Sequence, residues 1–160
     1  MLWRKKSKKA TNDEATENQV NESCVSENET VDIKDIEGAI EHYKSTPSEV
    51  TLLYSAGMAY LNGEYNAIPD KDKALMFLSR ASILGHVKSQ HLSGQLYMSK
   101  GLDNNDSITF VLGVTEIYEA YKKGCKEARE DLQDIVESGF FEDVSSVEDL
   151  CAVIEANSTV

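Results

Sequence analysis

The segment AGMAYLNG at residues 56–63 recurs, with one residue inserted, as SGQLYMSKG at residues 93–101. The glycine and the tyrosine of the two copies are each 37 residues apart. A period of about 20–50 residues is typical of stacked helical pairs. The repetition therefore predicts that the middle of the chain consists of helical repeats.

The second half of each repeat is also duplicated. Ala81-x-x-x-Gly85-His86 corresponds to Ala120-x-x-x-Gly124-Cys125, at an offset of 39 residues, as expected for small insertions in the loops. The glycines that follow expected helix ends supply the positive φ that ends a helix; they are Gly63, Gly85 and Gly124.

Gly57 and Gly94 lie inside expected helices instead. Glycine within a helix costs about 1 kcal/mol relative to alanine, so keeping it in both copies favours a packing role. Helices cross most closely where side chains are small. We therefore expect Gly57 to lie at a helix crossing with Ala74, and Gly94 to lie at the equivalent crossing in the next unit.

Apolar residues recur at helical spacing from Val31 onward, and no segment shows the alternation of a strand. The pattern predicts an all-α chain, with a first helix between Val31 and Pro47 and a last helix that begins in a capping box at Ser145 or Ser146. The helices between them are expected at 48–62, 70–84, 87–99 (ending near Gly101), 107–123 and 126–138.

The N-terminal segment has a different composition. Residues 1–30 hold almost nothing apolar beyond Leu2 and Trp3 and are rich in polar and charged residues. Such a segment does not bury enough surface to fold. We predict a disordered charged tail at 1–30 and a helical repeat domain at 31–157, with a partial repeat at about 31–47, repeats at 48–86 and 87–125, and capping helices at 126–157.

The repeat resembles the Sel-like repeat family, which is related to tetratricopeptide repeats. The resemblance is carried by Gly57, Tyr60, Gly63, Asp72-Lys73-Ala74, Arg80-Ala81 and Gly85-His86. The second copy lacks the Asp-Lys-Ala element. The resemblance implies a short α-solenoid of antiparallel helix pairs that binds another protein in a concave groove lined by the first helix of each pair.

The expected groove positions are those that differ between the copies while the packing positions agree. In the first copy they are Tyr54, Met58 and Leu61, and in the second they are His91, Gln95 and Met98. Methionine and aromatic side chains suit adaptable peptide binding. The alternative is that Tyr54, Leu61 and Met98 fill the core, as apolar helical stripes usually do.

Charge separates the chain into regions. The net charge is −12, yet residues 1–10 contain five bases, and residues 126–160 contain ten acids against Lys126 and Arg129. An acidic folded part disfavours binding to nucleic acid. Glu130, Asp134 and Glu137 share one helical face, which offers a second surface for a basic partner or is simply a solvated face.

Catalytic and metal chemistry find little support in the sequence. The three histidines and three cysteines form no known ligand or nucleophile motif, so we expect no catalytic residue, no metal and no cofactor. Cys125 precedes an expected helix start, which could lower its pKa. No apolar run is long enough to span a membrane, and unpaired cysteines fit a reducing cytoplasm.

The function expected from these features is that of an adaptor or regulator that binds a partner peptide or helix. The alternative is a dedicated chaperone or neutralising partner, for example of a secreted effector or toxin, because small size and acidity suit that role. An enzyme using Cys125 or the histidines is the third hypothesis.

Overall fold

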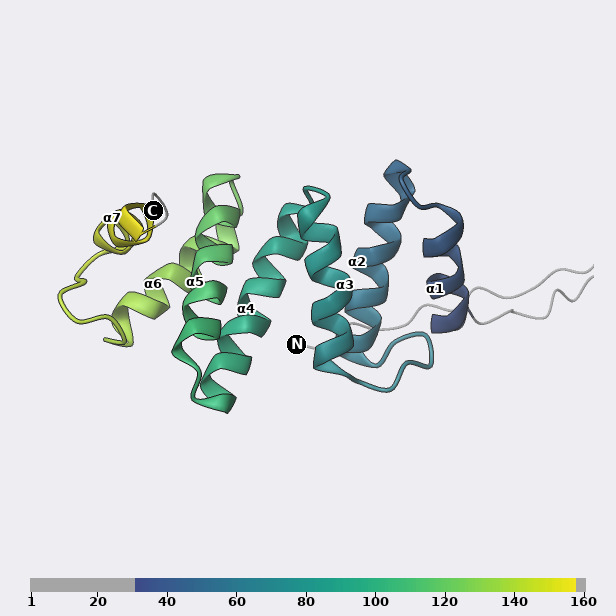
Figure 1. Ribbon diagram of the computed structural model, residues 1–160, viewed down its shortest axis with the longest axis horizontal. Coiled ribbons are helices and arrows are strands. Elements are labelled where there is room, and N and C mark those ends of the chain that lie inside the picture. The colour runs from purple at the N-terminus through teal and green to yellow at the C-terminus, as the bar shows by residue number, and fades with distance from the viewer. Residues whose placement is uncertain (1–30, 158–160) are drawn as a thin grey trace, which may run out of the picture.

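The computed structural model describes residues 31–157, so the predicted disordered tail at 1–30 lies outside the described residues. The described residues form seven helices and no strand, which confirms the all-α prediction. The helices are α1 (Ile33–His42), α2 (Pro47–Asn62), α3 (Lys71–Ile83), α4 (Val87–Asn104), α5 (Ser107–Lys122), α6 (Lys126–Glu137) and α7 (Val147–Asn157). They lie in a row in chain order, each packed against the next (Figure 1).

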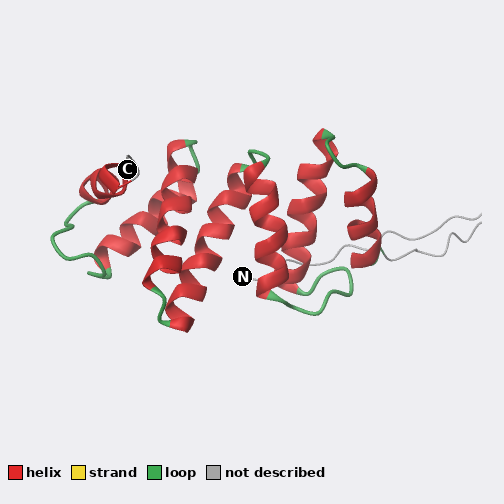
Figure 2. Ribbon diagram, viewed as in Figure 1, coloured by secondary structure: helices red, strands yellow, loops and turns green. Residues whose placement is uncertain are grey.

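Short connections join most of the helices, and the longer loops follow α2 and α6 (Figure 2). The turns after α3 and α5 have the same geometry. Gly85 and Gly124 both have φ of +91°, and the amide of the next residue donates to the carbonyl of Ala81 or Ala120 at 3.0 Å in both turns. The residues that match in sequence at an offset of 39 therefore form matching turns.

The helix crossings repeat in the same way. A Cβ atom on Gly57 would lie 2.6 Å from Cγ of Leu78 and 3.4 Å from the carbonyl oxygen of Ala74. A Cβ atom on Gly94 would lie 2.7 Å from Cγ1 of Ile117 and 2.9 Å from the carbonyl oxygen of Gly113. Ile117 and Gly113 follow Leu78 and Ala74 by 39 residues. The expected close crossings are thus confirmed in both copies.

The predicted end of the fourth helix near Gly101 is wrong. α4 continues to Asn104 and ends at Asn105, whose φ is +53°. Gly101 is buried inside α4, where an added Cβ atom would collide with the backbone of Phe110. This glycine permits a close approach of α5 instead of ending the helix.

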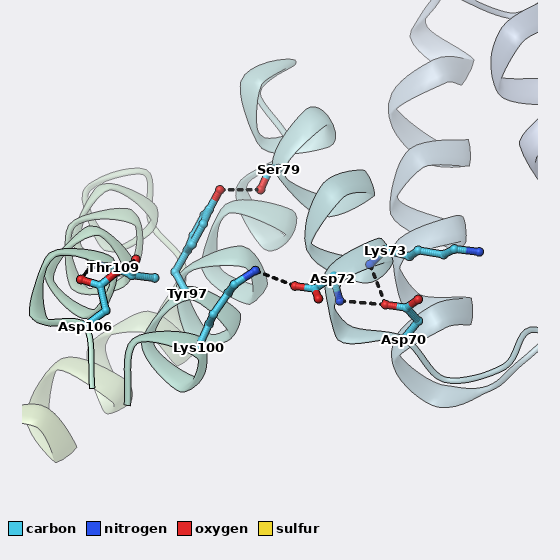
Figure 3. Close-up of polar contacts among 8 residues, drawn as sticks. All are labelled: Asp70, Asp72, Lys73, Ser79, Tyr97, Lys100, Asp106 and Thr109. Atoms are coloured by element: carbon cyan, nitrogen blue, oxygen red, sulfur yellow. Dashed lines mark hydrogen bonds and ion pairs between the residues drawn. The ribbon is translucent and has the colours of Figure 1, made fainter. Parts of the chain in front are cut away.

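The starts of α3 and α5 are both capped by aspartate. Asp70 accepts hydrogen bonds from the amides of Asp72 and Lys73, each at 3.0 Å. Asp106 accepts from the amides of Ile108 and Thr109, and from the Thr109 hydroxyl at 2.6 Å. Figure 3 shows both caps. These bonds satisfy amides that have no partner within the helix.

The buried apolar residues form two clusters. One lies among α1, α2 and α3 and the other among α5, α6 and α7. α4 lies between them and buries small and polar residues, which are Ser89, Gln90, His91, Ser93, Gly94 and Gly101. Polar contacts also join α4 to α3: Lys100 pairs with Asp72 at 2.6 Å, and the Tyr97 and Ser79 hydroxyls are 3.4 Å apart (Figure 3).

Candidate interaction groove

A hollow of about 430 Å³ lies between α4 and α6. Its lining residues, which define the α4–α6 groove, are Gln95, Met98, Leu102, Phe110, Ile117, Asp131, Asp134, Ile135, Ser138 and Phe140. Six of these ten residues are large and apolar, and two of the six are substantially exposed: Leu102 at 59% and Phe140 at 46%. Scattered exposed apolar side chains are ordinary, whereas apolar residues gathered in a hollow indicate a binding site.

Phe140 is held at the end of the groove by other aromatic rings. Its ring centroid lies 4.0 Å from that of Phe110 and 5.3 Å from that of Phe141. Phe110 is buried and Phe141 packs against the C-terminal core cluster. Phe140 therefore gives the groove an aromatic wall, although it lies in the connection after α6.

The rim of the groove is acidic. Asp131 and Asp134 are its charged residues, and none of the described residues that line it is basic. Oδ2 of Asp131 lies 2.7 Å from Nε2 of His91 and 2.7 Å from Nε2 of Gln95. His91 is only 6% exposed. One carboxylate thus links α6 to two side chains of α4.

The predicted groove residues are distributed unevenly. Gln95 and Met98 line the α4–α6 groove, and His91 lies buried beside it, bonded to Asp131. Met98 also packs against the C-terminal core cluster. This residue therefore both lines the groove and contributes to the core, which are the two alternatives that the sequence leaves open for it.

The three candidates on α2 do not line this groove. The ring of Tyr54 contacts that of His86, with centroids 4.7 Å apart. Leu61 packs against the N-terminal core cluster, as the core alternative predicts for it, and Met58 is half-buried.

Of the ten residues that line the groove, sequence reasoning assigned only Gln95 and Met98 to it, and the missed residues include Leu102, Asp131 and Phe140. The sequence pattern predicts a helix end near Gly101, which leaves Leu102 in the following loop. The Phe140–Phe141 pair in an otherwise polar segment is the signal that would have indicated an aromatic wall.

A second hollow, of about 670 Å³, lies beside the groove, between the end of α5 and α6. Its charged lining residues are of both signs: Lys126 and Arg129 are opposite in charge to Glu130 and Asp134. Asp134 belongs to both hollows. Glu137, the third residue of the predicted acidic face, accepts a hydrogen bond from Gln133 at 2.8 Å.

Cys125 shows no sign of thiol activation. Burial raises the pKa of this thiol, and the neighbouring Glu127 carboxylate acts in the same direction. A raised pKa lowers the thiolate fraction, which is opposite to the shift that its place before α6 suggests. Among residues 31–157 no cluster of three or more His, Cys, Asp or Glu side chains is arranged to hold a metal ion. None of the helices in this range combines the length and apolar character needed to cross a membrane.

Comparison with known proteins gives one short similarity. A stretch of 45 residues, 28% of the chain, is 51% identical to Protein DSF2 of Saccharomyces cerevisiae and covers 6% of that protein. No protein-family model matches the chain, and no solved structure matches it. The similarity is too short to establish a family, and the chain spans a small fraction of this relative.

Proposed function

We propose that the chain is a protein-interaction module, and that its α4–α6 groove binds a segment of another protein with apolar anchor residues and basic neighbours. The observation that carries the proposal is an apolar hollow, open at Leu102 and Phe140 and rimmed by Asp131 and Asp134. Apolar anchors supply most of the energy of such interfaces, and opposite charges at the rim favour the correct partner.

We further propose a short α-solenoid of antiparallel helix pairs of the Sel-like type. Three structural repetitions support it. The first is the pair of crossings at Gly57 and Gly94, and the second is the pair of matching turns at Gly85 and Gly124. The third is that Tyr60 and Tyr97 each place their hydroxyl against the preceding helix, at Glu37 of α1 and at Ser79 of α3. In this architecture α4 and α6 are successive first helices, which line the binding face.

A dedicated chaperone or neutralising partner is the second candidate. The density of acids after residue 126 favours it, because a basic effector would be attracted to this part of the chain and to the acidic rim of the groove. This role predicts a stable one-to-one complex with slow dissociation, whereas an adaptor releases its peptides readily. We expect either role to be performed in the cytoplasm, where thiols remain reduced.

The proposal is tested by selecting peptides from a random displayed library against the intact chain. We expect the selected peptides to combine apolar anchors with lysine or arginine. Their affinity is then measured by titration against Leu102→Glu and against a matched control, Ile83→Glu. Ile83 is also apolar and is 84% exposed, but it lies at the end of α3 outside the groove.

Leu102→Glu should weaken binding about tenfold or more, equivalent to ~1.4 kcal/mol, because it places a charge on the apolar lining. Ile83→Glu should leave the affinity unchanged, and circular dichroism should show equal helicity for both variants. Equal binding by wild-type chain and Leu102→Glu would show that the groove is not the binding site.

A further inference from the structure

The acidic rim and apolar lining of the α4–α6 groove complement one segment of the same chain. Residues 2–9 combine two large apolar side chains, Leu2 and Trp3, with a basic run. That run consists of Arg4, Lys5, Lys6, Lys8 and Lys9. We propose that residues 2–9 occupy the groove in the absence of a partner and compete with it, an inference that rests on the proposed function of this groove.

The chemistry of the segment matches what the groove requires. Its lining offers Met98, Leu102 and Phe140 to an apolar anchor. Trp3 is the only tryptophan of the chain, and tryptophan is the residue type most enriched among the anchors that dominate interface energy. Sulfur and aromatic side chains around it suit an indole ring.

Charge gives the segment a direction in the groove. The apolar pair comes first and the five bases follow it. With Trp3 on the apolar lining, the bases that follow it extend toward Asp131 and Asp134 at the rim. Elsewhere the body of the protein is also acidic, but these carboxylates border an apolar hollow. The complementarity therefore combines two independent interactions at one place.

The connecting chain is long enough. Residues 10–32 separate the basic segment from the start of α1, and a chain of this length spans at most ~80 Å when extended. Neighbouring helix axes are about 8–10 Å apart, so the distance along the row from α1 to α5 is roughly 40 Å. Because the two parts are tethered, even a weak contact is favoured over the same contact between separate molecules.

The consequence is a module that a partner must open. A partner peptide would bind only after displacing residues 2–9, so its apparent affinity is reduced by the fraction of chains whose groove is already filled. High salt would release the segment because screening weakens the contacts of its bases with the acidic rim. Negative charge added to the segment would release it because the rim carboxylates would repel that charge.

The test uses the intrinsic fluorescence of Trp3 in the intact chain. We expect its emission at shorter wavelength than that of a synthetic peptide of residues 1–10, with acrylamide quenching reduced several-fold. Leu102→Glu should restore peptide-like quenching, whereas Ile83→Glu should not. Raising the salt concentration should shift the intact chain toward the peptide value.

Two outcomes would overturn the proposal. Trp3 as exposed in the intact chain as in the peptide would show that the segment does not dock. If Trp3 remains protected from acrylamide quenching in Leu102→Glu, residues 2–9 dock at a place other than the groove.

A third measurement separates this proposal from the proposed function. Trp3→Glu should raise the affinity of the library-selected peptides for the groove. If those peptides bind at the groove and Trp3→Glu has no effect on their affinity, self-docking fails while the interaction function stands. If they do not bind at the groove in either form of the chain, the proposed function itself fails.

Discussion

Gly113→Ala tests whether the close crossing of α4 and α5 stabilises the fold. A Cβ atom at position 113 would lie 2.5 Å from the carbonyl oxygen of Gly94, 2.5 Å from the amide nitrogen of Met98 and 2.6 Å from its Cγ. Two of these three atoms belong to the backbone, so the helices must separate to accommodate a methyl group.

The expected cost follows from two opposing terms. Overpacking of this kind destabilises by about 1–3 kcal/mol, and contacts with backbone place this site at the upper end. Alanine recovers about 1 kcal/mol of helix propensity. The net loss is about 2 kcal/mol, which lowers the unfolding midpoint by roughly 6–10 °C in a domain of this size.

Gly38→Ala is the matched control, because Gly38 also lies within a helix but nothing lies within 4 Å of its would-be Cβ atom. This substitution should stabilise the protein by about 0.5–1 kcal/mol. Urea and thermal unfolding, followed by circular dichroism, measure both variants. If Gly113→Ala proves as stabilising as Gly38→Ala, the close crossing does not exist.

Three further predictions concern titratable groups. Nδ1 of His86 accepts the Ser89 amide at 3.2 Å, and burial lowers the pKa of His86 below its ordinary value of 6.5. The stabilising contribution of this cap is therefore complete above pH 6.5 and is lost as the pH falls through the lowered pKa. Between pH 7 and pH 5 the free energy of unfolding, measured in urea, should decline less in His86→Asn, whose amide caps without titrating. Asp106→Ala should cost about 1 kcal/mol in the same assay, and Asp106→Asn less, since an amide oxygen still accepts the Thr109 amide; equal stability of all three chains would refute this capping role. Cys125, in a chain whose other cysteines are serine, should react with iodoacetamide more slowly than free cysteine near neutral pH because its pKa is raised, and faster reaction would contradict the inferred environment.

The helices could be predicted because they depend on local and periodic features. Glycine at a helix end and apolar residues at helical spacing each predict structure over a few residues, and most expected helices begin and end within about two residues of the observed ones. Of the two serines predicted as caps of the last helix, Ser145 and Ser146, it is Ser146 whose hydroxyl accepts the Asp149 amide, at 3.1 Å.

Gly101 shows why other features could not be predicted. A glycine that ends a helix and a glycine that admits a neighbouring helix look the same in sequence, and only the position of Phe110 distinguishes them. Its misassignment removed Leu102 from the expected helix and hence from the expected groove. Asp131 was missed for a related reason, because its role depends on side chains of α4 that lie 36 and 40 residues earlier.

The groove depends on α4, α5 and α6, not on the whole row. Gly94 and Gly113 set the distance between α4 and α5, while Asp131 ties α6 to α4 through Gln95 and the buried His91. In a chain whose helices contact mainly their neighbours, stability is close to a sum of neighbour terms. Changes confined to α1 and α2 should therefore weaken the N-terminal cluster without closing the groove.

A substitution that neutralises Asp131 has two effects at once. It removes a charge from the rim that attracts a basic ligand, and it breaks the bonds that position the α4 wall, so lost binding in that variant does not separate recognition from shape. Leu102 is exposed in the groove and makes no such bond. A substitution at Leu102 therefore changes recognition of the ligand without changing the shape of the groove.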